Sequence, residues 1–217
     1  ELKGGPEKLI AMMEGDKDMG VRQAACEYAG GLGDAKLYPV YEKLLNDRSN
    51  GELWGDCFEG LVSMWADYPL YDTTNEDAYK LTLKLLESTP RTEQIPPWTA
   101  MGDFGYLESD TNKSLAEWKT KATWYKAEDL MKALGSVVAD GDAKWMARTG
   151  AVKSLAKLKA SKAMLEGLRK PLGDKPSGDD MHAAKALDTA LAAAKWRPTP
   201  HGQADACPCP PPSSTPP

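Results

Sequence analysis

The strongest constraint on the fold is a helical pattern that occurs twice in the chain, 126 residues apart. Residues 18–33 (DMGVRQAACEYAGGLG) align with residues 144–159 (KWMARTGAVKSLAKLK), so that Arg22 meets Arg148. Apolar and small residues recur every three or four positions in both copies, which predicts one buried face of an α-helix. Such a unit buries its apolar face only against its neighbours, so the pattern predicts a stacked array. The other aligned pairs are Val21–Ala147, Ala25–Ala151, Cys26–Val152, Ala29–Leu155 and Leu32–Leu158.

A second amphipathic helix is predicted directly after each copy. Residues 34–47 (DAKLYPVYEKLLND) and 161–170 (SKAMLEGLRK) carry apolar residues at the helical period. Asp34 and Ser161 begin these segments and belong to the residue types that cap helix N-termini. Valine and isoleucine are few and strict alternation is missing, which argues against strands. The sequence therefore predicts an all-α fold built from helical hairpins.

The run D-x-x-V-R-x-x-A…L-G-D-A-x-x-x-P-x-x-x-x-L-L-x-D over residues 18–47 resembles a HEAT repeat of the short bacterial kind. Such repeats carry Val-Arg near the start of the second helix and Pro in the next first helix, where Val21, Arg22 and Pro39 stand here. The resemblance extends over residues 127–170 and is weaker elsewhere. It implies a right-handed α-solenoid of about five HEAT-like hairpins, with a closed helical bundle as the alternative.

The same periodicity organises the rest of the chain into one helical domain and a tail. Residues 1–196 form the predicted domain, and residues 197–217 (RPTPHGQADACPCPPPSSTPP) form a Pro-rich, low-complexity tail. The tail has too few apolar side chains to fold alone, so we expect it to be disordered or extended, partly as polyproline II. It is also a candidate contact to a neighbouring subunit. Further helices are predicted at residues 6–14, 51–65, 75–88, 95–107, 127–139 and 179–195.

Two aromatic stretches interrupt the repeat, at residues 66–74 and 108–126. Insertions in repeat proteins gather on one face, which is often the binding face, and Trp and Tyr are frequent anchors in interfaces. The alternative is that these side chains pack back against the helices and fill the groove of the array. The predicted partner-binding residues are Trp65, Tyr68, Tyr71, Trp118, Trp124 and Tyr125.

Charge is unevenly distributed along the chain. Residues 1–112 carry a net charge of -11 and residues 113–217 a net charge of +6, which together give -5. An acidic chain is unlike a general nucleic-acid binder, and the contrast between its halves favours steering of a partner or head-to-tail association. No stretch of about 18 apolar residues predicts a membrane span.

Few residues offer chemistry. His182 lies in the last predicted helix and His201 in the tail, and neither has a second ligand at metal-site spacing. Weaker alternatives are a calcium site at residues 72–77 (DTTNED) and a soft-metal site formed by His201, Cys207 and Cys209. The sequence therefore predicts no catalytic residue, no cofactor and no metal.

Two cysteines, Cys26 and Cys57, lie inside predicted helices, 31 positions apart. A disulfide needs Cα atoms within about 7 Å, whereas stacked helices usually lie about 8–10 Å apart. We therefore expect two buried free thiols. A bridge between them would indicate export to an oxidising compartment.

These observations predict a non-catalytic protein-binding scaffold, or a subunit of a larger complex, that contacts a protein partner through its concave face and aromatic insertions. The alternative function, implied by the resemblance alone, is a lyase-like or chaperone-like HEAT protein acting on a cofactor-bearing partner. The start at Glu1, the Ser/Thr/Pro-rich tail and the aromatic stretches favour an exported protein, periplasmic or at a cell surface. A cytoplasmic scaffold is the other expectation.

Overall fold

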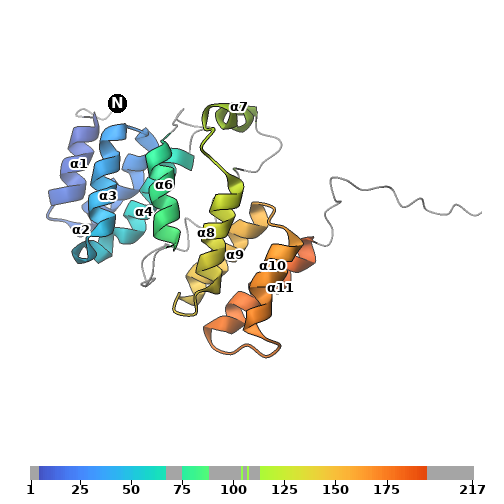
Figure 1. Cartoon of the computed structure of the whole chain (residues 1–217). Helices are drawn as coiled ribbons and strands as arrows, with labels where there is room; N and C mark the ends of the chain where they lie inside the picture. Colours follow the sequence, from blue (N-terminus) through green and yellow to red (C-terminus); the bar gives the residue numbers. More distant parts are fainter. Residues whose placement is uncertain (1–4, 67–74, 88–103, 105–106, 108–112, 195–217) are drawn as a thin grey trace, which may run out of the picture.

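A computed structural model of the chain describes residues 5–66, 75–87, 104, 107 and 113–194. All regular structure within these ranges is helical, so the all-α prediction is confirmed there (Figure 1). The α-helices are α1 (Gly5–Gly15), α2 (Met19–Ala29), α3 (Tyr38–Asn46), α4 (Trp54–Ala66), α6 (Glu76–Glu87), α7 (Lys113–Lys121), α8 (Ala127–Ala139), α9 (Trp145–Lys157), α10 (Lys162–Arg169) and α11 (Asp179–Ala194). Short 3-10 helices lie at η1 (Gly30–Leu32), η2 (Ala35–Leu37), η3 (Arg48–Leu53) and η5 (Lys170–Leu172).

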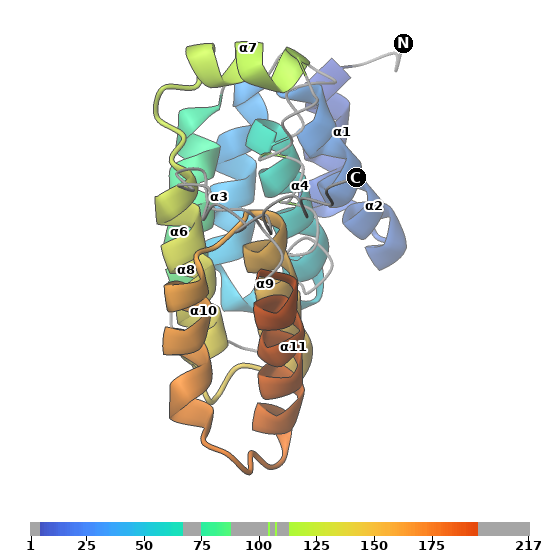
Figure 2. The same ribbon diagram turned by 90° about the vertical axis from the view of Figure 1, so that its right-hand side faces the viewer.

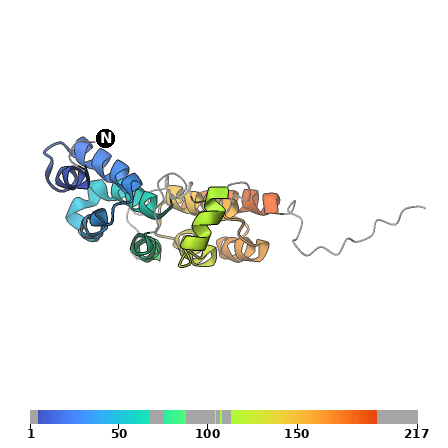
Figure 3. The same ribbon diagram turned by 90° about the horizontal axis from the view of Figure 1, so that it is seen from above.

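The helices pair into hairpins that follow one another along an elongated body. The contacting pairs are α1 with α2, α3 with α4, α8 with α9, and α10 with α11. Helices α6, α8 and α10 lie in one row, and α9 and α11 lie beside each other in the other row (Figure 3). Each helix of these four pairs thus packs on its partner and on a helix of a neighbouring pair.

The region between α4 and α9 departs from this regularity. The helix predicted at residues 95–107 falls outside the described part of the chain except for Phe104 and Leu107, which are both buried. The stretch 108–126, expected as an irregular insertion, contains α7, which lies across the end of the rows (Figure 2). Leu115 and Trp118 are one helical turn apart and both buried, which explains why this segment forms a helix.

Side-chain caps define several helix starts. Asp34 Oδ1 accepts a hydrogen bond from the Lys36 backbone N–H (2.9 Å), and Ser161 Oγ accepts one from the Met164 N–H (3.2 Å). Both predicted caps are therefore confirmed. Each satisfies a backbone donor that the first helical turn leaves unpaired.

The repeated arginine makes the same contact in both copies. Arg22 Nε donates to the Met13 carbonyl (3.0 Å), and Arg148 Nε donates to the Val138 carbonyl (3.0 Å), in each case near the end of the preceding helix. Arg148 is almost completely buried and also forms an ion pair with Asp180 at the start of α11 (2.7 Å). Because Arg22 and Arg148 make equivalent hydrogen bonds, the two segments correspond in structure as well as in sequence.

Cys26 of α2 and Cys57 of α4 form a disulfide, so the prediction of free thiols is wrong. Their Cα atoms are only 4.5 Å apart, because the two helices cross much more closely than usual. Glycines permit the approach: a Cβ on Gly30 would overlap the Gly60 backbone, and a Cβ on Gly60 would overlap the Cys26 carbonyl. Neither sulfur-bearing residue is exposed to solvent.

Candidate functional site

The aromatic residues predicted to bind a partner do not all lie on the surface. Trp65 and Trp118 are completely buried, which corrects their assignment as partner-contact residues, because neither ring presents a surface. The Trp65 indole N–H donates to Thr82 Oγ1 (3.0 Å), so its polar atom is also satisfied inside the fold. Tyr68 and Tyr71 lie outside the described residues.

Trp124 and Tyr125 are half-buried and extend the same cluster. The rings of Trp118 and Trp124 meet edge to face at 5.9 Å, and the Tyr79 ring lies 5.1 Å from Trp124. The Tyr79 hydroxyl donates to the Lys126 carbonyl (2.9 Å), and burial raises the pKa of Tyr79 to about 12. The cluster therefore joins α4, α6, α7 and the segment before α8, the packing alternative raised by the sequence.

An apolar groove lies between α9 and α11. It encloses about 380 Å³. The groove extends from the N-terminal end to near the C-terminal end of both helices, which lie side by side (Figure 2). Its floor consists of small or β-branched apolar side chains, namely Val152, Ala156, Ala186, Ala190 and Ala193.

One end of the groove is aromatic. The rings of Trp145, the first residue of α9, and His182, in the first turn of α11, lie 4.6 Å apart at an interplanar angle of 30°. Trp145 is 39% exposed although it is among the largest side chains of the protein. An exposed indole beside a concave apolar surface is the kind of residue that anchors a binding partner.

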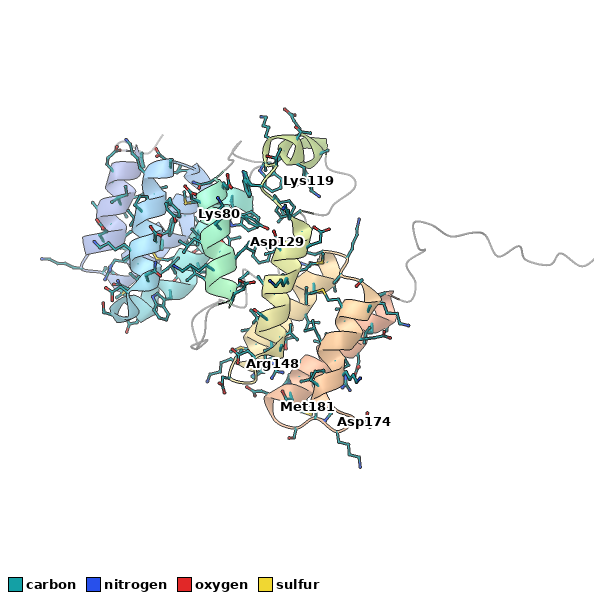
Figure 4. All side chains as sticks on the ribbon, in the orientation of Figure 1. Lys80, Lys119, Asp129, Arg148, Asp174 and Met181 are labelled. Atoms are coloured by element: carbon teal, nitrogen blue, oxygen red, sulfur yellow. A yellow bond between two sulfur atoms is a disulfide. The ribbon has the colours of Figure 1, made fainter. Side chains whose placement is uncertain are left out.

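The aromatic end is held in place by the contacts between the two helix starts. The Trp145 backbone N–H donates to Asp179 Oδ2 (3.3 Å), and the buried Arg148 pairs with Asp180. Figure 4 shows Arg148 and Met181 at this same end of the helices. Met146 and Met181 add flexible apolar surface, since they are 40% and 50% exposed.

The groove also carries unpaired polar groups. Lys153 and Lys185 are exposed and form no ion pair within the part of the chain that the structure describes, unlike Lys162, which pairs with Glu166. The Thr149 hydroxyl is buried in the wall and has no hydrogen-bond partner among the described residues. The site therefore combines an apolar floor, an aromatic end and positively charged edges.

The side chains that line the groove limit the chemistry available there. The residues that line the groove include one imidazole but no thiol and no carboxylate, so His182 has no acid–base partner there. The described residues contain no cluster of three His, Cys, Asp or Glu side chains able to hold a metal ion. His201, Cys207 and Cys209, and most of the candidate calcium segment 72–77, lie outside these residues.

Trp145 was not among the predicted partner-binding residues, because the aromatic anchors were expected in the insertions rather than in the repeats. A signal was present: Trp145 and Met146 stand side by side at a helix start, so at least one of them must leave the buried face. The structure shows both exposed and brings Trp145 next to His182, which lies 37 positions later. That proximity depends on helix packing and has no local sequence signature.

Within the described residues, no helix is long and apolar enough to cross a membrane. Comparison of the chain with protein-family models, with curated proteins and with solved structures finds no match.

Proposed function

We propose that this protein is a non-catalytic binding scaffold, a short right-handed α-solenoid of HEAT-like hairpins that holds an extended segment of a partner protein. The observation that supports the proposal is the groove between α9 and α11, with the exposed indole of Trp145 at its end. The stacked hairpins and the repeated arginine contacts support the solenoid reading.

The chemistry of the groove indicates the kind of segment that fits. Its shallow apolar floor accepts small or ring-shaped apolar side chains rather than a bulky helix. Lys153 and Lys185 can donate hydrogen bonds to carbonyl or carboxylate oxygens of the bound chain. An extended peptide exposes its carbonyl groups along its whole length, so it satisfies both requirements.

Substitution of the anchor tests this function. Tagged wild-type protein, Trp145→Ala and Tyr28→Ala are purified from the native host, and the accompanying proteins are quantified by mass spectrometry. Loss of an anchor aromatic typically weakens binding by about 2 kcal/mol, or roughly thirtyfold, so Trp145→Ala should lose a specific partner. Tyr28 is a matched control because it is 70% exposed on α2, far from the groove. Equal recovery of every partner by both variants would contradict the proposal.

We also propose that the protein works in an oxidising compartment. The Cys26–Cys57 disulfide supports this location, since such bonds are rare in reducing cytosol. Peptide mapping by mass spectrometry of protein isolated without reductant should recover the Cys26 and Cys57 peptides as one joined species, two hydrogens lighter than the reduced pair. A fully reduced pair in the native host would instead favour a cytoplasmic location.

A further inference from the structure

We propose that the groove between α9 and α11 is occupied, in the absence of a partner, by the Pro-rich run of the chain's own tail, residues 208–212 (PCPPP). The inference rests on the proposed function in one respect, because both assign the same groove to an extended peptide. It adds that the tail of the chain competes with the partner for this groove. The site is then regulated by the chain that contains it.

The composition of the tail fits the groove chemically. Eight of the 16 prolines of the chain lie within residues 197–217, and three are consecutive at positions 210–212. Proline favours the polyproline II conformation, in which carbonyl groups point outward and make no internal hydrogen bonds. Grooves lined by aromatic residues recognise this conformation, since flat proline rings pack on indole and imidazole faces. Trp145 and His182 offer such faces, and Lys153 and Lys185 offer donors to the carbonyls.

The position of the groove also fits the path of the chain. Helix α11 ends at Ala194, and Ala193 lines the groove, so the tail begins at one end of the site. From Ala156 to Trp145, the groove extends along α9 for about 16 Å, at 1.5 Å for each helical residue. About five residues of polyproline II span that length. The thirteen residues 195–207 reach up to about 43 Å when extended, which is ample for the chain to turn back and bring residues 208–212 to Trp145.

Tethering makes this occupant effective even if its intrinsic affinity is weak. A short flexible linker holds its ligand at an effective concentration of about 1 mM, which exceeds the concentration of most partner proteins in a cell. A partner must therefore displace the tail. Because the tail is already part of the chain, its binding does not cost the translational entropy that a separate peptide would lose.

The two tail cysteines provide a direct test on the full-length protein. The variant Cys209→Ser leaves Cys207 as the thiol to be labelled, because Cys26 and Cys57 are buried in their disulfide. A nitroxide spin label on Cys207 broadens nearby NMR signals, and its reduction with ascorbate gives the reference spectrum. We expect the Trp145 indole N–H and the His182 ring protons to lose at least half their intensity. The ring protons of Tyr28, on α2, should be unchanged.

Two further samples identify the cause of any broadening. Replacement of Pro208, Pro210, Pro211 and Pro212 by serine in the labelled chain should restore the His182 signals, because the polyproline preference is lost. In a mixture of isotope-labelled chain without nitroxide and unlabelled chain with nitroxide, signals should stay sharp if the tail binds its own groove. Broadening in that mixture would show that the tail of a neighbouring copy is the occupant, which would overturn the proposal. Absence of broadening in the labelled chain itself would overturn it as well.

Failure of this inference is distinguishable from failure of the proposed function. The spin-label measurement needs no partner, whereas the purification with Trp145→Ala depends on one. Sharp signals together with Trp145-dependent capture would support the scaffold function and exclude the tail as an occupant of the groove. Broadened signals together with capture that is indifferent to Trp145 would make the groove a site for the tail alone.

Discussion

At the scale of single residues, Gly60 helps to decide how closely α2 and α4 pack. Gly60 has no room for a methyl group, because its Cβ would overlap the Cys26 carbonyl and the Tyr41 hydroxyl. Gly167, on α10, has no neighbouring atom within 4 Å of the same position. The same substitution must therefore have opposite effects at these two sites.

We expect Gly60→Ala to lower the free energy of unfolding by about 3 kcal/mol, since overpacking of a tight crossing forces the helices apart. Gly167→Ala should raise it by up to about 1 kcal/mol, because alanine is the better helix former and meets no obstacle. Urea denaturation followed by circular dichroism measures both. Similar values for the two variants would contradict the close packing of α2 on α4.

The buried guanidinium of Arg148 gives a second prediction at this scale. Its removal leaves the Val138 carbonyl without its donor and Asp180 without its partner, so Arg148→Met should destabilise the fold by about 2–3 kcal/mol. A suitable control is Lys162→Met, since Lys162 forms only an exposed ion pair with Glu166. That change should alter the unfolding free energy by less than about 0.5 kcal/mol. Equal effects would show that Arg148 is not a structural link between α9 and α11.

At the scale of elements, α7 is held to the body by its aromatic contacts. Trp118 is fully buried and meets Trp124 and Tyr125, while few other large side chains of α7 face the core. Trp118→Ala should therefore destabilise the protein by about 3–5 kcal/mol and reduce its helical signal. Trp145→Ala is the matched control, because a side chain that is 39% exposed loses little packing. Thermal unfolding of the two variants would contradict this assignment if Trp145→Ala were the more damaging change.

The helices themselves could be predicted from the sequence, because each depends on local periodicity and on caps such as Asp34 and Ser161. Whether the aromatic side chains of the insertions face solvent or pack against the helices could not be predicted. Trp118 lies in a short polar-rich segment, and its inward direction depends on contacts with the rings of Trp124 and Tyr125, which follow α7. The disulfide escaped prediction for a similar reason, since the close crossing requires Gly30 and Gly60 to meet from different hairpins. The groove is likewise a product of packing between helices that are distant in sequence.

At the scale of the whole molecule, charge separation follows the long axis. Residues 1–112, which carry a net negative charge, include α1 to α6, and residues 113–217, which carry a net positive charge, include α7 to α11. The two ends of the elongated body therefore differ in the sign of their net charge (Figure 1). Opposite ends of two copies therefore attract, over a range that salt shortens to about 10 Å at 0.1 M. We expect reversible head-to-tail association at low ionic strength.

Sedimentation velocity over a range of protein concentrations tests this expectation. At about 10 mM salt the sedimentation coefficient should rise with concentration, and at about 300 mM salt it should not, because the Debye length then falls well below the size of the charged ends. Lys153→Glu combined with Lys185→Glu should weaken the association at low salt, since both lysines are exposed on the basic half and unpaired among the described residues. An apolar interface would behave differently, because salt would leave it unchanged or strengthen it. A coefficient that is independent of concentration at both salt levels would show that the charge asymmetry does not drive self-association.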